Sequence, residues 1–320
     1  MVALKLYFKS EIREIANLSF VLFERLQELS ELHKNDLLPG YTHFQLAMPS
    51  SFGLWFGAYA EALVDDLELL ATAYSVSDKN PLGSGAGYGS AFPINRKITT
   101  KQLQMRTLNF NSLYAQLTRG KTEKLLLNAI AGIAATVSKF SYDVCVYLNQ
   151  QFAYISFPES LTTGSSIMPH KKIPDVFELL RAKCNRIQAT PNEMTLLINN
   201  LPSGYHRDMQ LTKDIVFPAI DSMKECLQMF LFSLQNIQVH QNILDDDKFN
   251  DLFTVDTINQ YVQSGMSFRE AYRKVGTEVN EGSFKPIKNI HHTHEGSIGN
   301  LCNDEIKEQM LLVMQRFVNA

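Results

Sequence analysis

The residues best suited to chemistry lie in a short polar segment, Thr163–Asp175, which reads TGSSIMPHKKIPD. It places the hydroxyls of Ser165 and Ser166 a few residues before Lys171. A helix is expected to begin at about Pro174, because proline is favoured in the first helical turn. A Gly-Ser-Ser run by itself is more typical of a flexible linker. The methionine, prolines and lysines around it instead favour a loop that brings hydroxyl and ammonium groups to a site.

Two further segments carry polar and ionisable side chains. Pro39–Pro49 contains a histidine, the side chain whose ordinary pKa lies nearest neutral pH. Leu201–Gln210 combines hydroxyl, amide and charged groups and is followed by a lysine. Taken alone, such a histidine is more often structural than functional, and the second segment resembles a solvated helix start. The candidate side chains are Thr42, His43 and Gln45 in the first segment and Tyr205, Gln210 and Lys213 in the second.

A rival site near the end of the chain could be interpreted as a set of metal ligands: His291, His292, His294 and Glu295. The cluster lacks the i, i+4 histidine pair of helical zinc sites and has no obvious fourth ligand. We therefore expect a polar loop there and no metal centre.

Long helices must position these segments. Apolar residues recur at helical spacing from Leu4 to His33, over about eight turns. The middle run Leu125–Val137 is apolar on almost every side, so we expect protein to surround it. Strand signals are nearly absent, which predicts an all-α fold built on a long-helix central bundle, shared between subunits. The other expected helices are Ser50–Ser77, Ser112–Gln151, Pro174–Asn199 and Gln210–Val239, the last bent or restarted at Pro218.

The helices become shorter and the loops longer after Asp245–Asp247. We therefore predict two units. Residues 1–244 form the central helical bundle that carries the chemical motifs, and residues 245–320 form a small C-terminal helical domain.

Composition excludes several classes of function. The formal net charge of -3 gives no basic surface for nucleic acid. The sequence has no window of about 18 uncharged apolar residues, so no membrane span is predicted. Lysine and glutamate interrupt the apolar residues at the start of the chain, whereas a signal peptide needs an uninterrupted apolar region. The glycines of Pro81–Pro93 do not fit the GxGxxG register of a dinucleotide site. Four scattered cysteines favour reduced thiols and a cytoplasmic location.

The motifs resemble those of one family. GSSIMPHKKIP resembles the GSSxMPxKxNP signature of the fumarase/aspartase superfamily, and its continuation DVFELLRAKCNRI resembles the argininosuccinate lyase branch. PGYTHFQLAMP is similar to that family's PGYTHLQxAQP, and LPSGYHRDMQ to the segment in which it holds substrate. The resemblance extends along essentially the whole chain. It implies β-elimination of argininosuccinate to arginine and fumarate in arginine biosynthesis, without metal or organic cofactor, in a homotetramer whose active sites are each built from three subunits.

The same resemblance assigns roles to individual residues. A carbon-bound proton beside a carboxylate is very weakly acidic, so a strong, oriented base and electrostatic stabilisation are needed. Ser165 would be this base, with its alkoxide stabilised by nearby N–H groups or by Lys171, in a loop that closes over substrate as a lid. His43 would act as the acid towards the leaving nitrogen or have a positioning role, and it would be paired with Glu178, which fixes its tautomer. Substrate-binding roles fall to Thr42, Gln45, Tyr205, Gln210 and Lys213.

Two departures from the family pattern bear on activity. Ile173 replaces a substrate-binding asparagine, and an alkyl side chain leaves a polar substrate group unpaired, at a cost of about 1–3 kcal/mol. The family's amino-terminal domain and its Ser-Arg-Asn-Asp-Gln segment, expected immediately before Val2, are not in this sequence. We therefore expect either that Met1 is an internal start or that the active site of this chain is incomplete.

Two alternative functions follow. The first is adenylosuccinate lyase or another lyase of the superfamily. Adenylosuccinate lyase shares the MPHK motif, although the PGYTHFQ and LPSGYHRDMQ motifs favour argininosuccinate as substrate. A catalytically impaired or non-enzymatic helical assembly is favoured by Ile173 and by the missing amino-terminal part. The presence of Ser165, His43 and the other motif residues opposes it.

Overall fold

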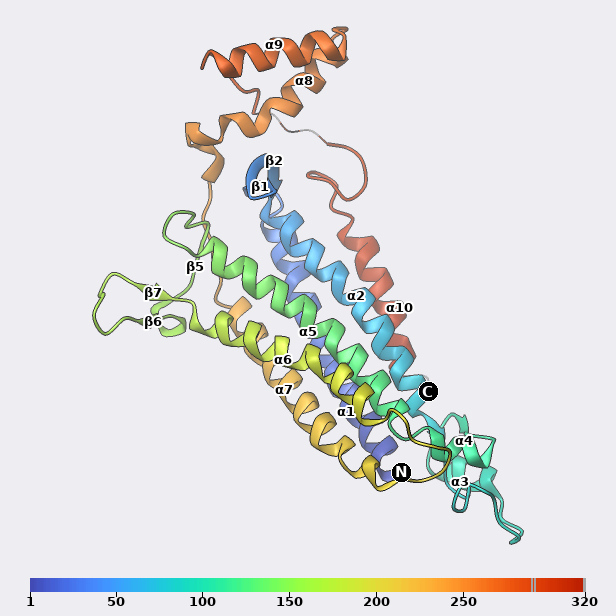
Figure 1. The fold of residues 1–320 in the computed structure, drawn as a ribbon. Helices are drawn as coiled ribbons and strands as arrows, with labels where there is room; N and C mark the ends of the chain where they lie inside the picture. The colour runs from blue at the N-terminus through green and yellow to red at the C-terminus, as the bar shows by residue number, and fades with distance from the viewer. Residues whose placement is uncertain (289, 291, 319–320) are drawn as a thin grey trace.

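Six long helices run side by side and form the body of the molecule (Figure 1). The computed structural model describes residues 1–288, 290 and 292–318. The predicted all-α fold with a long-helix bundle is confirmed. The long helices are α1 (Val2–Leu32), α2 (Phe52–Ser77), α5 (Lys121–Tyr147), α6 (Asp175–Leu197), α7 (Thr212–Leu234) and α10 (Asn303–Val318).

Short elements connect the helices. The strands form two-residue pairings, apart from one longer hairpin of β1 (Leu37–Thr42) and β2 (Gln45–Ser51). The other pairs are β3 (Lys79–Asn80) with β4 (Thr107–Leu108), β5 (Ile155–Ser156) with β8 (Gln238–Val239), and β6 (Thr163–Gly164) with β7 (Lys172–Ile173). The short helices are α3 (Arg96–Gln102), α4 (Ser112–Leu117), α8 (Thr254–Gln263) and α9 (Phe268–Asn280), and the 3-10 turns are η1 (Glu159–Leu161), η2 (Arg207–Gln210), η3 (Ile243–Asp245) and η4 (Asp247–Phe253).

Local sequence explains where some of the helices begin and end. The Ser51 hydroxyl caps α2 by accepting the Leu54 N–H at 3.0 Å. The run predicted as one helix over Ser112–Gln151 is wrong in one respect, because Gly120, with φ of 74°, separates α4 from α5. Of the bend or restart expected at Pro218, the restart is absent, since α7 continues through this residue.

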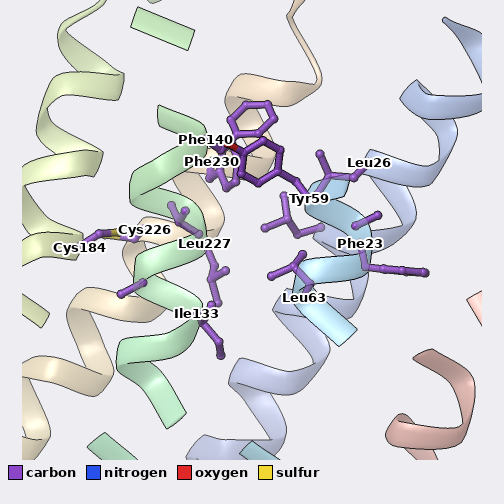
Figure 2. Close-up of a cluster of buried hydrophobic side chains, with 14 of the residues drawn as sticks. Phe23, Leu26, Tyr59, Leu63, Ile133, Phe140, Cys184, Cys226, Leu227 and Phe230 are labelled. Carbon is purple, nitrogen blue, oxygen red and sulfur yellow. The ribbon is translucent and has the colours of Figure 1, made fainter. Parts of the chain in front are cut away.

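The core is built around α5, as its apolar sequence predicted. Figure 2 shows Ile133 and Phe140 of α5 between Tyr59 and Leu63 of α2 and Leu227 of α7. Each such buried side chain stabilises the fold by about 1.5–3 kcal/mol. By length and composition α5 could also span a membrane, but 50% of its apolar window is buried inside the bundle. It therefore resembles the core helix of a globular protein.

The segment after residue 244 divides between two cores. α8 and α9 pack on each other through Ile258, Ala271 and Val275 beyond one end of the bundle (Figure 1). The apolar face of α10 instead joins the main core, through Met310, Phe317 and their neighbours, and packs on α2 and α1. The division into residues 1–244 and 245–320 stays a prediction, and its last helix shares the bundle's core.

Candidate active site

The predicted base lies in a loop that projects from the start of α6 (Figure 1). We call residues 165–171, between β6 and β7, the serine loop. Within it the half-buried Ser165 Oγ accepts the backbone N–H groups of Met168 at 3.1 Å and Ile167 at 3.4 Å. Two N–H donors on one oxygen stabilise an anion more than a neutral hydroxyl. The sequence could not reveal these donors, because they belong to the backbone.

The other charged residues predicted for this part of the site face solvent. The backbone N–H of Lys171 closes the serine loop on the Met168 carbonyl at 3.0 Å, and its side chain is exposed. Glu178 is exposed one turn into α6. Within the described residues neither side chain has a hydrogen-bond or ion-pair partner. Both groups are thus open to contact from outside the chain.

Ile173 occupies the base of the same loop. It pairs with Thr163 across the β6–β7 hairpin, and its side chain is half-buried. This pairing satisfies the backbone hydrogen bonds of the hairpin, so residue 173 does not need to be apolar for the strand to form. The alkyl group offers no hydrogen bond to a ligand.

The predicted histidine lies at the tip of the β1–β2 hairpin, which we call the histidine hairpin. Register places Thr42 directly opposite Gln45, and the two turn residues, His43 and Phe44, have φ of 55° and 60°. Such angles fit a tight hairpin turn but are uncommon for residues other than glycine, asparagine and aspartate. Thr42, His43 and Gln45 are all exposed. Within the described chain the structure does not bring His43 to Glu178, so their pairing stays a prediction.

The third group of predicted residues is brought together. In the tyrosine segment, residues 201–213, the Gln210 Nε2 donates to the Tyr205 hydroxyl at 2.5 Å. The Lys213 ammonium donates to the Gln210 Oε1 at 3.0 Å. The segment borders a cavity of about 150 Å³ that Gln116, Arg119 and Lys121 also line. This chain of hydroxyl, amide and ammonium suits a ligand with carboxylate and amino groups.

The tyrosine segment lies far from both the serine loop and the histidine hairpin in one chain. The serine loop precedes α6 and the tyrosine segment follows it, and 23 helical residues span about 34 Å. The histidine hairpin follows the carboxyl end of α1, whereas the amino end of that helix lies near the tyrosine segment (Figure 1). A site that uses all three groups must therefore draw them from more than one copy of the chain.

The rival histidine cluster ties a loop to α8. His291 lies outside the described residues. The His292 ring bonds Ser297 Oγ at 2.7 Å through Nδ1 and Asp256 Oδ1 at 3.1 Å through Nε2, and His294 bonds the Glu295 carbonyl at 3.1 Å. Both ring nitrogens of His292 are thus engaged in the structure of the loop.

Comparison with known proteins identifies relatives along nearly the whole chain. Residues 1–189 match a family described as lyase. Argininosuccinate lyase of Parabacteroides distasonis is 53% identical over 99% of this chain and 71% of its own length. The enzyme of Bacteroides thetaiotaomicron is 52% identical with the same coverage, and that of Thermotoga neapolitana is 36% identical over 86% of this chain and 69% of its own length.

Solved structures share the fold. EDDS lyase in complex with formate has a TM-score of 0.79 at 17% identity and covers 98% of this chain and 70% of its own. Class II fumarase from Schistosoma mansoni has a TM-score of 0.75 at 15% identity and covers 100% and 70%. At these identities the likeness supports a common helical architecture.

Proposed function

The chain belongs to the argininosuccinate lyase family, and we propose that it performs the reversible β-elimination that splits argininosuccinate into arginine and fumarate. In this reaction a base removes a proton from the carbon beside a carboxylate, the adjacent C–N bond breaks, and an acid protonates the departing guanidino nitrogen. No metal or organic cofactor enters the proposal.

Ser165 is the proposed base, and the two N–H donors on its Oγ are the observation that carries this proposal. An alkoxide there would receive two hydrogen bonds from fixed backbone groups, which lowers the cost of losing the hydroxyl proton. Closure of the serine loop over substrate would exclude water and strengthen these bonds. The exposed Lys171 side chain, on the same loop, would then stabilise charge on the substrate carboxylate.

His43 and Glu178 are proposed to act on the leaving nitrogen. A carboxylate on one imidazole nitrogen orients the ring and leaves the other nitrogen to give a proton. Because the hairpin tip and the start of α6 do not meet within one chain, we propose that the pair forms between copies. Thr42 and Gln45, opposite each other beside His43, would contact the same substrate.

The tyrosine segment is proposed to hold the amino-acid end of the substrate, through Tyr205, Gln210 and Lys213. Since this segment and the serine loop lie at opposite ends of α6, the proposal includes a homotetramer whose active sites are shared by three subunits. A cytoplasmic location in arginine biosynthesis, and a division into residues 1–244 and 245–320, belong to the same proposal.

Fumarate release tests the function. Purified protein is given argininosuccinate or adenylosuccinate in the presence of a chelator, and fumarate is followed by its ultraviolet absorbance. We expect release from argininosuccinate alone, reduced at least about 100-fold by Ser165→Ala, a typical loss for a general base. Ser166→Ala is the matched control and should retain most activity. Release from adenylosuccinate alone would assign the other lyase reaction. Release from neither substrate would support the alternative function, a non-enzymatic helical assembly.

A further inference from the structure

Arg119 lies directly beneath the tyrosine segment, although about 90 residues separate them in sequence. Its guanidinium donates through NH2 to the Met209 carbonyl at 2.7 Å. The same group lies over the Tyr205 ring, 5.7 Å from the ring centroid. Met209 belongs to η2, the turn that ends at Gln210. One side chain therefore contacts both the ring and the turn that carry the proposed substrate contacts.

The Arg119 side chain is held in place by burial and by a neighbouring charge. Its exposed fraction is 11%, and the Glu123 side chain, one turn along α5, is 4% exposed with Oε1 3.9 Å from Arg119 Nε. Burial raises the pKa of Glu123, and the nearby Arg119 charge opposes that rise. The pair is an electrostatic contact, and Arg119 Nε and Glu123 Oε2 are buried without a hydrogen-bond partner among the described residues.

The backbone next to Arg119, at Gly120, also packs closely against the tyrosine segment. Gly120 has φ of 74°, and a Cβ placed on it would be 2.5 Å from Ile198 Cγ2 and 3.4 Å from Met209 Sδ. The junction between α4 and α5 therefore packs tightly on both ends of the connection from α6 to α7. Arg119 has little freedom to point elsewhere.

We propose that Arg119 is a positioning residue for the elimination reaction, one that orients Tyr205 and Gln210 toward the substrate. This inference rests on the proposed function. Arginine is required because a planar guanidinium can donate in its plane to a carbonyl while its face lies on an aromatic ring. A lysine keeps the charge but cannot make both contacts.

The test compares steady-state kinetics of Arg119→Lys with those of Arg25→Lys. Arg25 is a suitable control because it too donates to a backbone carbonyl, that of Leu234, at 3.3 and 3.4 Å. We expect Arg119→Lys to raise KM about tenfold with kcat within about twofold, because substrate holding is lost while the base is untouched. Arg25→Lys should leave both constants unchanged.

A second measurement separates positioning from general stability. In a Tyr205→Leu background the Arg119→Lys substitution should raise KM by clearly less than the tenfold expected in the unmodified chain, since residues that act through one another are not additive. Calorimetric titration with arginine should show a parallel loss of affinity for Arg119→Lys.

Three results would overturn the inference. They are an unchanged KM in Arg119→Lys, a full additional effect in the Tyr205→Leu background, and loss of folded protein in both Arg119→Lys and Arg119→Gln. Failure of the unmodified chain to release fumarate is a different result, and it would refute the proposed function first.

Discussion

A half-buried carboxyl group between α2 and α5 should make the stability of this fold depend on pH in an unusual direction. Asp66 Oδ2 accepts the Thr136 hydroxyl at 2.6 Å. The α5 backbone closes over the other oxygen, because a Cβ on Gly132 would be 2.9 Å from Asp66 Oδ1. Burial raises the pKa of Asp66 from 3.8 to about 6, although the hydrogen bond from Thr136 lowers it.

The raised pKa fixes the sign of the effect. The folded state binds this proton more tightly than the unfolded state, so the stability contributed by the protonated group is complete below pH 3.8 and is lost as pH rises through about 6. A difference of about two pKa units corresponds to about 2–3 kcal/mol. Asp66→Asn removes the charge and keeps an oxygen that can accept from Thr136. It should therefore stabilise the protein by about 2–3 kcal/mol at pH 7.5 and have little effect at pH 4.

Urea unfolding of Asp66→Asn and of the unmodified chain, at pH 4 and pH 7.5, measures this difference. Glu61→Gln is the control, because Glu61 is an exposed carboxyl on the same helix. Its unfolding midpoint should not move at either pH. A lower midpoint for Asp66→Asn at pH 7.5, or an equal shift at both pH values, would refute the assignment of a half-buried, proton-binding carboxyl.

Other substitutions test single features. Ile173→Asn should raise kcat/KM for argininosuccinate about 5–150-fold by restoring a hydrogen-bonding group worth about 1–3 kcal/mol, and unchanged kinetics would mean that another feature limits activity. Gly120→Ala should lower the unfolding free energy by at least about 1–2 kcal/mol, because of its φ of 74° and a contact of 2.5 Å. Gly164→Ala, which would meet nothing within 4 Å, should change it by less than about 0.5 kcal/mol, and equal effects would contradict the packing described. Ser51→Ala should cost about 1 kcal/mol in thermal or urea unfolding, and no loss would mean that this cap does not stabilise α2.

Sequence periodicity was sufficient for the long helices and for the buried position of α5. It could not show the break at Gly120, because apolar residues continue on both sides of that glycine. The histidine hairpin was missed for a related reason. Its turn is His43-Phe44, whereas the residues that usually indicate a two-residue hairpin are asparagine and glycine.

The membership of each candidate group was predictable, but its place in space was not. Tyr205, Gln210 and Lys213 are close in sequence, so local structure gathers them. The distance between this segment and the serine loop follows from the length of α6, but the position of both relative to the histidine hairpin depends on how the helices pack, which side-chain types do not specify. The sequence also could not show the N–H groups that donate to Ser165 or the contact of Arg119 with Met209, because each of these involves a backbone atom.

Mixing two inactive variants tests the shared active site most directly. Ser165→Ala damages only the serine loop, and Lys213→Met damages only the tyrosine segment. The two are unfolded together in equal amounts, refolded, and assayed for fumarate release from argininosuccinate. If the two segments come from different copies, hybrids should recover about one quarter of the unmodified activity, because each segment is intact in half of the copies. Hybrids that assemble but stay as inactive as either parent would contradict a site shared between copies.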